Sequence, residues 1–425
     1  MGKGHWVTTW TAMPQLTEPD NLPPAPYAKE GLMLADTTLR QTVRVSMGGR
    51  RVRLRVSNGF GGAPLPITRA AVALPDSEPA TGGPVSGGAV TGGAGQDGGA
   101  AAGGVGRGGG AGASAILPGT SRAVTFAGRA GAVVPMGAHV VSDPLEFDLA
   151  PGSVLAVTLH LAQGQASSEL TSHPGSRTTS HLATGDHVDA PDLPAATPVD
   201  HWYLLSAVEV WSERPAATLV LLGDSLTDGR GSTTNGNDRW PDRLFDRLPP
   251  GVAVANQGAG GNRVLNDGLG PSALARLDRD VLAQSGARWL IVFEGVNDLG
   301  TAPATRHDQE RAATDLIAAY EQIIERARAR DLLVYGATLT PFGGHDPYDD
   351  PERHREAARQ AVNAWIRDAG RYDGVIDFDR AVADPAAPRR LARPFDEGDH
   401  LHLNPAGYRA LAEAVPIGLF GRPTP

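Results

Sequence analysis

The stretch that decides the fold is ATLVLLGDSLTDG, at residues 217–229. Its first six residues are continuous and apolar except for one threonine, as expected for a strand covered on both faces of a parallel sheet. Similar runs follow at residues 252–256, 289–293, 332–337 and 375–378. Amphipathic segments lie between them, and in residues 309–330 the apolar side chains keep a helical spacing at Ala312, Leu316, Tyr320, Ile323, Ile324 and Ala327. The alternation predicts a doubly wound α/β domain with a five-stranded parallel sheet.

The first half of the chain has a different pattern, in which apolar and polar side chains alternate over short segments. Residues 38–58 alternate in this way around Gly48-Gly49, which predicts a β-hairpin. The same alternation returns at residues 123–126, 140–149, 155–161 and 202–211. Short strands separated by turn residues predict an antiparallel, jelly-roll-like β-sandwich. We therefore divide the chain into a β-sandwich domain at residues 1–213 and an α/β domain at residues 214–425.

A glycine-rich segment interrupts the predicted sandwich at about residues 82–112. It consists mostly of Gly, Ala and Ser and has almost nothing bulky to bury, so we interpret it as a flexible insertion. It contains a Gly-x-Gly-x-x-Gly match at Gly104, Gly106 and Gly109. No strand precedes this match and no helix follows it, so it does not predict a dinucleotide site.

Composition excludes several classes of protein. The 425 residues are 41% hydrophobic and 20% charged, which excludes a wholly disordered chain. The formal net charge of -9 has the wrong sign for general binding to phosphate backbones, so we expect no nucleic-acid partner. The absence of cysteine excludes thiol nucleophiles and thiolate metal sites.

No apolar run reaches the roughly 18 residues of a membrane span, so we expect a soluble protein without membrane insertion. A secreted protein whose signal peptide has been removed and a cytoplasmic protein both fit this sequence. The sequence does not indicate an oligomeric state.

Ser225 directly follows the first apolar run, at the edge of the sheet where ligands of such folds bind. A serine there acts as a nucleophile if a base reaches it. The alternative is that Ser225 only caps the following helix, because serine is a favoured N-cap residue.

A base and its orienting carboxylate are available near the C-terminus, where Asp399 precedes His402 by three residues. This spacing lets the carboxylate fix the imidazole tautomer while the other ring nitrogen faces a nucleophile. Glu397 and His400 have the same spacing, so spacing alone does not choose between the two pairs.

Two further strand ends carry groups that can bind an oxyanion. NQGAGGNR follows the second apolar run at residues 256–263, and EGVND follows the third at residues 294–298. Glycine backbone N–H groups and the Asn297 amide are suitable donors for the oxygen that becomes negative in acyl transfer. Glycine clusters also form turns and asparagine also caps helices, so each segment alone is weak evidence.

Together the four segments resemble the ordered blocks of the SGNH (GDSL) hydrolases, over roughly the last half of the chain. The resemblance implies a flavodoxin-like, three-layer fold, with Ser225 as nucleophile, His402 as general base and Asp399 as its orienter. It favours His402 over His400, because the family's histidine precedes a short Asn, Pro and Gly-Tyr tail. The chain has no Gly-x-Ser-x-Gly elbow, which argues against an ordinary α/β-hydrolase.

The same resemblance implies an oxyanion hole formed by the Ser225 N–H, the Gly261 N–H and the Asn297 amide. Gly261 is preferred because it lies five residues after Asn256, the spacing of the family's block. Gly260 is the alternative.

The first half, with Trp6 and Trp10 at its start and Trp202-Tyr203 near its end, is similar in layout to the β-sandwich that precedes some two-domain SGNH esterases, including ones that act on carbohydrates. The expected function is a carboxylic ester hydrolase that forms an acyl-enzyme, acts on short acyl groups such as acetyl on a carbohydrate, and needs no cofactor or metal. The alternatives are a lipase or arylesterase of broader range, an acyltransferase, and a carbohydrate- or protein-binding module with an inactive scaffold.

Two polar features of the first half have open interpretations. The loop from His173 to His181 can reach over the catalytic mouth, but its histidine spacing is poor for a metal. The row Arg51, Arg53 and Arg55 is either a solvated sheet face or a seat for the second domain or an anionic substrate.

Overall fold

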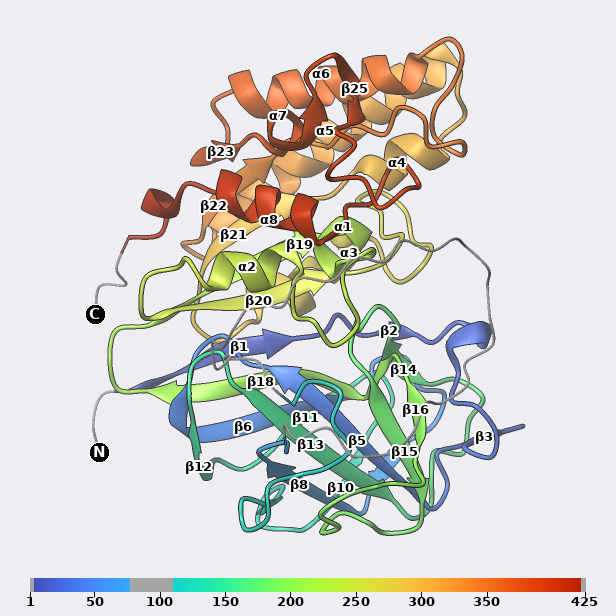
Figure 1. Cartoon of the computed structure of the whole chain (residues 1–425), viewed down its shortest axis with the longest axis vertical. Coiled ribbons are helices and arrows are strands. Elements are labelled where there is room, and N and C mark those ends of the chain that lie inside the picture. Colours follow the sequence, from blue (N-terminus) through green and yellow to red (C-terminus); the bar gives the residue numbers. More distant parts are fainter. Residues whose placement is uncertain (1–3, 77–109, 422–425) are drawn as a thin grey trace, which may run out of the picture.

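The computed structural model describes residues 4–76 and 110–421. The first half of the chain forms an antiparallel β region and the second half an α/β region, stacked one above the other in Figure 1. Most of the predicted glycine-rich insertion, with its Gly-x-Gly-x-x-Gly match, lies outside the described residues.

The α/β region contains the predicted five-stranded parallel sheet. Its strands are β19 (Ala217–Gly223), β20 (Val252–Gly258), β21 (Ala287–Phe293), β22 (Leu333–Ala337) and β23 (Gly374–Ile376). They lie in the order β20-β19-β21-β22-β23, with every pair parallel. This is the strand order of flavodoxin-like sheets, in which the ligand site lies where the order reverses, at the carboxyl ends.

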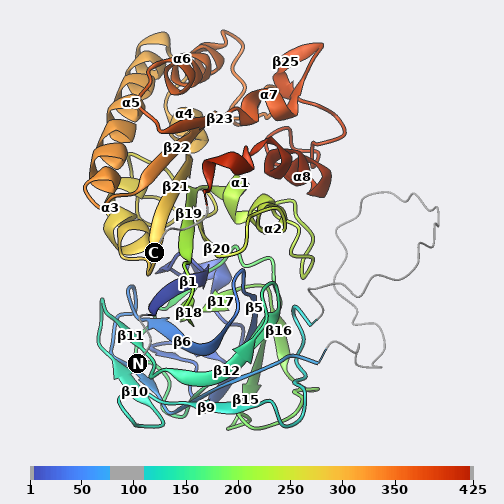
Figure 2. The same cartoon turned by 90° about the vertical axis from the view of Figure 1, so that its left-hand side faces the viewer.

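Helices cover both faces of this sheet, as Figure 2 shows. Along β19, Leu219 and Leu221 pack into one apolar cluster while Val220 and Leu222 pack into the other. This two-sided burial explains why the strand sequence is continuously apolar rather than alternating. One face carries α3 (Ala273–Leu277), α5 (Arg306–Arg328) and α6 (His354–Asp368), and the other carries α2 (Trp240–Phe245), α7 (Phe378–Val382) and α8 (Pro405–Ala414).

Short elements complete the α/β region. They are α1 (Ser225–Asp228), α4 (Val296–Thr301), the π-helical turn Asp278–Leu282, the 3₁₀ turn Ile417–Leu419, and the paired strands β24 (Ala383–Asp384) and β25 (Ala387–Leu391). In the described parts of the chain, no helix has the length and apolar character needed to cross a membrane.

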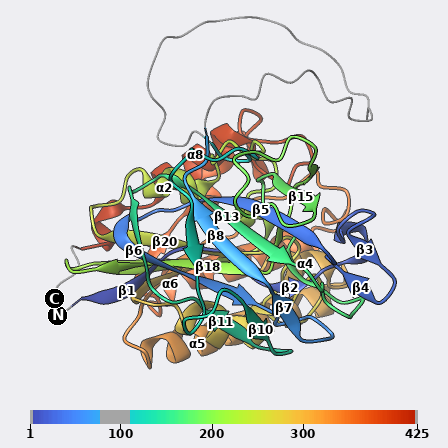
Figure 3. The same cartoon turned by 90° about the horizontal axis from the view of Figure 1, so that it is seen from below.

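The β region is built mainly from two antiparallel sheets. The first contains β1 (His5–Thr11), β6 (Gly49–Ser57), β11 (His139–Val141), β12 (Leu145–Leu149) and β18 (Leu205–Ser212). The second contains β5 (Thr37–Arg44), β8 (Arg69–Ala73), β9 (Arg122–Val124), β13 (Val154–Leu161), β15 (Ser180–Thr184) and β16 (Thr197–Val199). Figure 3 shows β8 and β13 crossing β18 in projection, and side chains from both sheets form one core.

Smaller pairings surround these sheets. They involve β2 (Gln15–Leu16), β14 (Thr171–His173) and β17 (Trp202–Tyr203) in one group, β3 (Ala28–Lys29) with β4 (Leu32–Met33), and β7 (Leu65–Ile67) with β10 (Ala132–Val134). The 3₁₀ turn Pro19–Asn21 follows β2.

The predicted hairpin at residues 38–58 is wrong, although both of its strands exist. β5 pairs with β13 and β15, whereas β6 pairs with β18, β11 and β12. The chain therefore crosses from one sheet to the other between the two strands. Alternation identifies strands, but it does not identify their partners when two sheets enclose one core.

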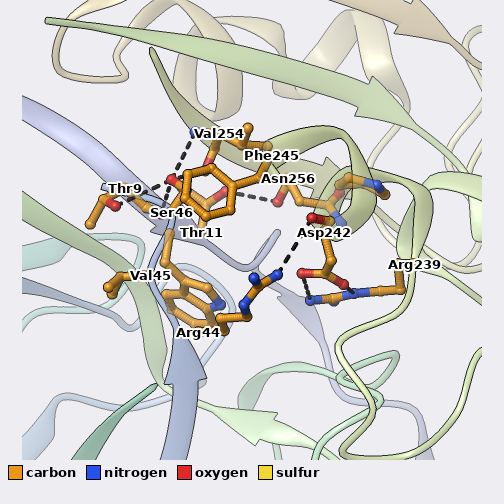
Figure 4. A pocket seen from close by; sticks show the side chains of 12 residues that line it. Thr9, Thr11, Arg44, Val45, Ser46, Arg239, Asp242, Phe245, Val254 and Asn256 are labelled. Carbon is orange, nitrogen blue, oxygen red and sulfur yellow. Dashed lines mark hydrogen bonds and ion pairs between the residues drawn. The ribbon is translucent and has the colours of Figure 1, made fainter. Parts of the chain in front are cut away.

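The β region covers the open edge of the parallel sheet, where β20 is the terminal strand. Ser46 Oγ accepts a hydrogen bond from the Val254 N–H at 2.8 Å, and Thr11 Oγ1 donates to the Asn256 carbonyl at 2.7 Å (Figure 4). Beside them the Arg44 guanidinium pairs with Asp246 at 2.8 Å. Hydroxyl groups thus satisfy backbone atoms that an uncovered edge strand would leave exposed.

The arginine row of β6 also contributes to this junction. Arg53 and Arg55 both pair with Glu209, whose side chain is 1% exposed. Ser285 of the α/β region donates to the same carboxylate at 2.9 Å. The interpretation of this arginine row as a solvated face is therefore wrong for Arg53 and Arg55. Arg51 has the most exposed side chain of the three, at 37%.

Candidate active site

A cleft lies at the carboxyl ends of the parallel strands, between the α/β region and the β region. The α/β region contributes Ser225, Gly261, Asn297, Asp399 and His402 to its lining. The facing wall comes from the β region and contains Gln15, Glu18, Asn21, Pro174, Gly175, Arg177, Asp200 and His201. All five residues predicted for the site are therefore brought to one place.

Ser225 is the first residue of α1, immediately after β19. The N-cap of this helix is Asp224, whose side chain accepts from the Leu226 N–H at 2.9 Å. The alternative that Ser225 serves as the cap is therefore wrong. The Ser225 hydroxyl oxygen lies 2.8 Å from His402 Nε2, within hydrogen-bond distance.

His402 is held by Asp399 on the loop before α8. The Nδ1 atom of His402 lies 2.6 Å from one Asp399 carboxylate oxygen, and the other oxygen accepts the backbone N–H groups of Leu401 and His402. Burial acts to raise the pKa of Asp399, but the hydrogen bonds from the His402 ring and backbone outweigh it and hold that pKa well below its usual range. Asp399 is therefore a carboxylate that fixes His402 with Nδ1 protonated and Nε2 facing Ser225.

The second histidine of this loop is arranged differently. His400 Nδ1 lies 2.6 Å from Asp396, not from Glu397, and the His400 side chain is 48% exposed. The Glu397–His400 pairing that spacing left open is therefore wrong, and the Asp396–His400 pair lies on the surface.

The oxyanion candidates converge beside Ser225. Asn297 Nδ2 donates to the Asn262 carbonyl at 2.8 Å, which turns the amide nitrogen toward the glycine segment. Gly261 has a φ of +67°, in the left-handed region that favours glycine. The alternative donor, the Gly260 N–H, instead bonds to Asp228 at 3.1 Å, so the geometry favours Gly261.

Tyr348 is a part of the site that the sequence analysis did not identify. Its hydroxyl donates to Asn297 Oδ1 at 2.8 Å, which fixes the orientation of the amide. His345, on the same loop, has Nδ1 2.7 Å from the Asp399 carbonyl. This loop follows β22, so the rule that ligands bind at the carboxyl ends of parallel strands could have directed attention to it.

A layer of buried acids lies beneath the cleft. Burial is the main cause that raises the pKa of Asp224 to about 7, of Glu294 to about 8 and of Asp298 to about 6. Arg276 lies 3.4 Å from Glu294 and donates to the carbonyls of Gly223 and Gln257 at the ends of β19 and β20. These groups hold the strand ends that carry the site.

The histidines of the 173–181 loop bind different partners. His173 contacts Met13 and Asp228, whereas His181 Nε2 lies 2.9 Å from the Gly112 carbonyl. Within the described ranges, no group of three or more His, Asp or Glu side chains is arranged to hold a metal ion. The loop does reach the cleft, through Pro174, Gly175 and Arg177.

Comparison with family models finds a match within the α/β region. The model of the GDSL-like lipase/acylhydrolase family matches residues 221–410. No curated protein matches the chain.

Among solved structures, the chain is similar to a G-D-S-L family protein from Desulfitobacterium hafniense DCB-2, with 18% identity, 47% of this chain and 97% of that chain covered, and a TM-score of 0.36. A lipase/acylhydrolase from Enterococcus faecalis has 22% identity, 47% and 92% coverage, and a TM-score of 0.35. The acetyl xylan esterase AlAXEase has 18% identity, 46% and 96% coverage, and a TM-score of 0.33.

Proposed function

We propose that the protein is a serine esterase of the SGNH type that works through an acyl-enzyme on Ser225. The match of the GDSL-like lipase/acylhydrolase family model to residues 221–410 supports an enzyme that hydrolyses esters. The observation that carries the proposal is the continuous line from Ser225 Oγ to His402 Nε2 at 2.8 Å and from His402 Nδ1 to Asp399 at 2.6 Å. A hydroxyl, an imidazole and a carboxylate in this order are the elements of an activated serine nucleophile.

In the first half of the reaction, His402 Nε2 takes the proton from the Ser225 hydroxyl as Oγ attacks the ester carbonyl carbon. The carbonyl electrons move to oxygen, and the Ser225 N–H, the Gly261 N–H and the Asn297 amide stabilise the resulting oxyanion. The intermediate collapses, and His402 gives its proton to the departing alcohol oxygen. The carboxylate of Asp399 stabilises the imidazolium and remains unprotonated throughout.

In the second half, water replaces the alcohol. His402 takes a proton from water as the water oxygen attacks the acyl carbon of the ester on Ser225. Collapse of this second intermediate breaks the bond to Oγ, and the proton returns to Ser225. The products are a carboxylic acid and the free serine, and no cofactor takes part.

The substrate we propose is a short acyl group, such as acetyl, on a carbohydrate. The wall contributed by the β region supports this assignment because it presents amide, guanidinium, carboxylate and imidazole groups, on Asn21, Arg177, Asp200 and His201. Such groups hydrogen-bond a polyhydroxylated alcohol, whereas a long alkyl chain requires an apolar groove.

The test compares wild-type and Ser225→Ala enzymes on p-nitrophenyl acetate, butyrate and octanoate, with acetate release from acetylated xylan measured in parallel. The proposal predicts activity that declines with acyl length and disappears in Ser225→Ala. Equal activity of the two enzymes would refute the nucleophile, and a maximum at octanoate would favour a lipase. Product analysis with added alcohols distinguishes an acyltransferase, because transfer would form a new ester in place of the acid.

A further inference from the structure

A second histidine–aspartate pair joins the β region to the site and takes no part in the proton transfers above. His173, at the end of β14, is 4% exposed, and Asp228, at the end of α1, is 1% exposed. His173 Nε2 lies 2.9 Å from Asp228 Oδ1, and the imidazole stacks on Trp202 with ring centroids 5.8 Å apart. The pair is therefore almost completely buried at the junction of the two halves of the chain, and Asp228 also lines the cleft.

The partners of His173 determine its role as a donor. Its Nδ1 lies 3.0 Å from the Met13 carbonyl oxygen, which can only accept a hydrogen bond. Its Nε2 faces the carboxylate of Asp228. Both ring nitrogens therefore face oxygen atoms that can accept a hydrogen bond.

Asp228 connects this pair to the oxyanion segment. Its second oxygen, Oδ2, accepts the Gly260 N–H at 3.1 Å, and the next residue is Gly261, the proposed oxyanion donor. The neighbouring N–H groups of the segment have other partners, since Gly258 donates to Asn256 Oδ1 at 2.8 Å and Ala259 donates to the Gly223 carbonyl at 3.0 Å. Asp228 is thus the side chain that fixes the peptide immediately before the Gly261 N–H.

The loop after β14 packs closely on the same carboxylate. A Cβ atom added at Gly175 would lie 1.8 Å from Asp228 Oδ2, so only glycine allows this approach. Arg239 is a cation near Asp228, but its guanidinium hydrogen-bonds Asp242 at 2.8 Å. His173 is therefore the side chain that lies within hydrogen-bond distance of Asp228 Oδ1.

We propose that His173 is a positioning residue through which the β region fixes the oxyanion segment of the α/β region. The His173 imidazole orients the Asp228 side chain, and Asp228 holds the Gly260 peptide so that the Gly261 N–H points at the developing oxyanion. The catalytic meaning of this role rests on the proposed function. The β region is then a structural part of the active site as well as one wall of the cleft.

The test uses the full chain with His173→Gln, His173→Leu and Asp228→Asn. Glutamine retains one N–H that can reach Asp228, whereas leucine leaves a buried carboxylate without its partner and can impair folding. Arg44→Gln is the matched control, because Arg44 pairs with Asp246 between the two regions and its side chain lines the separate pocket of Figure 4. Rates are expressed per serine labelled by a fluorophosphonate, so that unfolded protein does not count.

We expect His173→Gln to lower kcat by about 10- to 100-fold, less than the loss of a whole oxyanion donor, with KM within about threefold. His173→Leu, if folded, loses more, and the double variant with Asp228→Asn loses little beyond the larger single effect, because both act on one peptide. Arg44→Gln keeps kcat within about twofold. A wild-type kcat in His173→Gln, or equal losses in His173→Gln and Arg44→Gln, would overturn the proposal.

A measurement independent of activity accompanies these rates. Amide hydrogen exchange of residues 258–262 should be faster in His173→Gln than in wild type and unchanged in Arg44→Gln. Unchanged exchange in His173→Gln overturns the positioning role whatever the rates show. If wild-type enzyme hydrolyses no ester, the proposed function fails, and exchange alone then decides whether His173 holds the segment.

Discussion

The two walls of the cleft are built in different ways. On one wall Ser225, Asn297 and His402 follow strands or precede helices of a single α/β region, each within a short sequence block. On the other wall, Arg177 and His201 reach the cleft only because two regions of the chain pack together. In the function proposed above, the first wall carries the chemistry, and the second holds the substrate and supports the first. Substitutions should therefore have effects on kcat that decrease from the groups of the first wall to the Ser46 contact at the junction of the two regions.

The largest loss of kcat is expected from a change to the Asp399–His402 pair on the first wall. Asp399→Asn should lower kcat by about 10⁴-fold, because an amide does not hold His402 in the tautomer that accepts the serine proton. His400→Gln is the matched control, since it alters an exposed histidine–aspartate pair on the same loop, and its kcat should stay within about twofold of wild type. Steady-state kinetics on p-nitrophenyl acetate measure both. Similar losses of kcat in the two variants would show that both substitutions act by disturbing the structure of the loop and not through the tautomer of His402.

The next effect tests the oxyanion donors. Asn297→Ala should lower kcat by about 100- to 1000-fold with little change in KM, because the amide acts on the transition state. Fluorophosphonate labelling counts the folded enzyme in the same samples. An Asn297→Ala enzyme with unaltered kcat/KM would remove Asn297 from the oxyanion hole.

A smaller loss of kcat is expected from a change to Tyr348, which acts through Asn297. Tyr348→Phe removes the hydroxyl that orients the Asn297 amide, and a net hydrogen bond of about 1 kcal/mol corresponds to a loss of about fivefold in kcat. In the Asn297→Ala background the same change should have no further effect, because it acts through that amide. Independent, multiplicative losses in the double variant would refute this coupling.

Behind both walls, the buried acids should affect stability rather than the chemical step. The pKa of the Glu294 carboxyl is raised from 4.5 to about 8 in the folded protein. Between these two pH values the folded protein therefore keeps a proton that the unfolded chain has released. The free energy of unfolding therefore falls as pH rises through this window. Glu294→Gln should make the decrease in Tm between about pH 5 and pH 8 smaller than in wild type. Melting curves with the same pH dependence in both proteins would contradict the assignment.

The smallest effect on catalysis is expected at the Ser46 contact of the junction, which does not involve the His173–Asp228 pair. Ser46→Ala leaves the Val254 N–H without its acceptor, which should lower Tm by about 2 to 10 °C and leave kcat within about twofold. Ser153→Ala is the control, since its hydroxyl bonds an exposed carbonyl, and it should leave Tm within about 1 °C. A large loss of kcat in Ser46→Ala at unchanged Tm would show that the Ser46 contact affects the chemistry directly.

The contrast between the walls also explains which features of the fold and the site could be predicted from the sequence. The five parallel strands and the places of Ser225, Asn297 and His402 were predicted because each depends on a local pattern or a short spacing, and the order of four blocks resembles a known family. The role of Tyr348 was missed because its loop carries no distinctive spacing, only a position after a strand.

Contacts between distant segments were not predictable in the same way. The proposed hairpin failed because alternation gives the buried face of a strand but not its neighbour. His173 and Asp228 are 55 residues apart and lie in different regions, so nothing local indicates that they meet. The division at residue 213 and the substrate stay predictions, because both depend on how the two regions behave together.

The most direct test of the central claim is to label the wild-type chain with a fluorophosphonate and locate the modified residue by peptide mass spectrometry. We predict one modification, on Ser225, which is abolished by Ser225→Ala and strongly slowed by His402→Ala. Labelling at another residue, or an unlabelled wild-type chain, would contradict the assignment of Ser225 as an activated nucleophile.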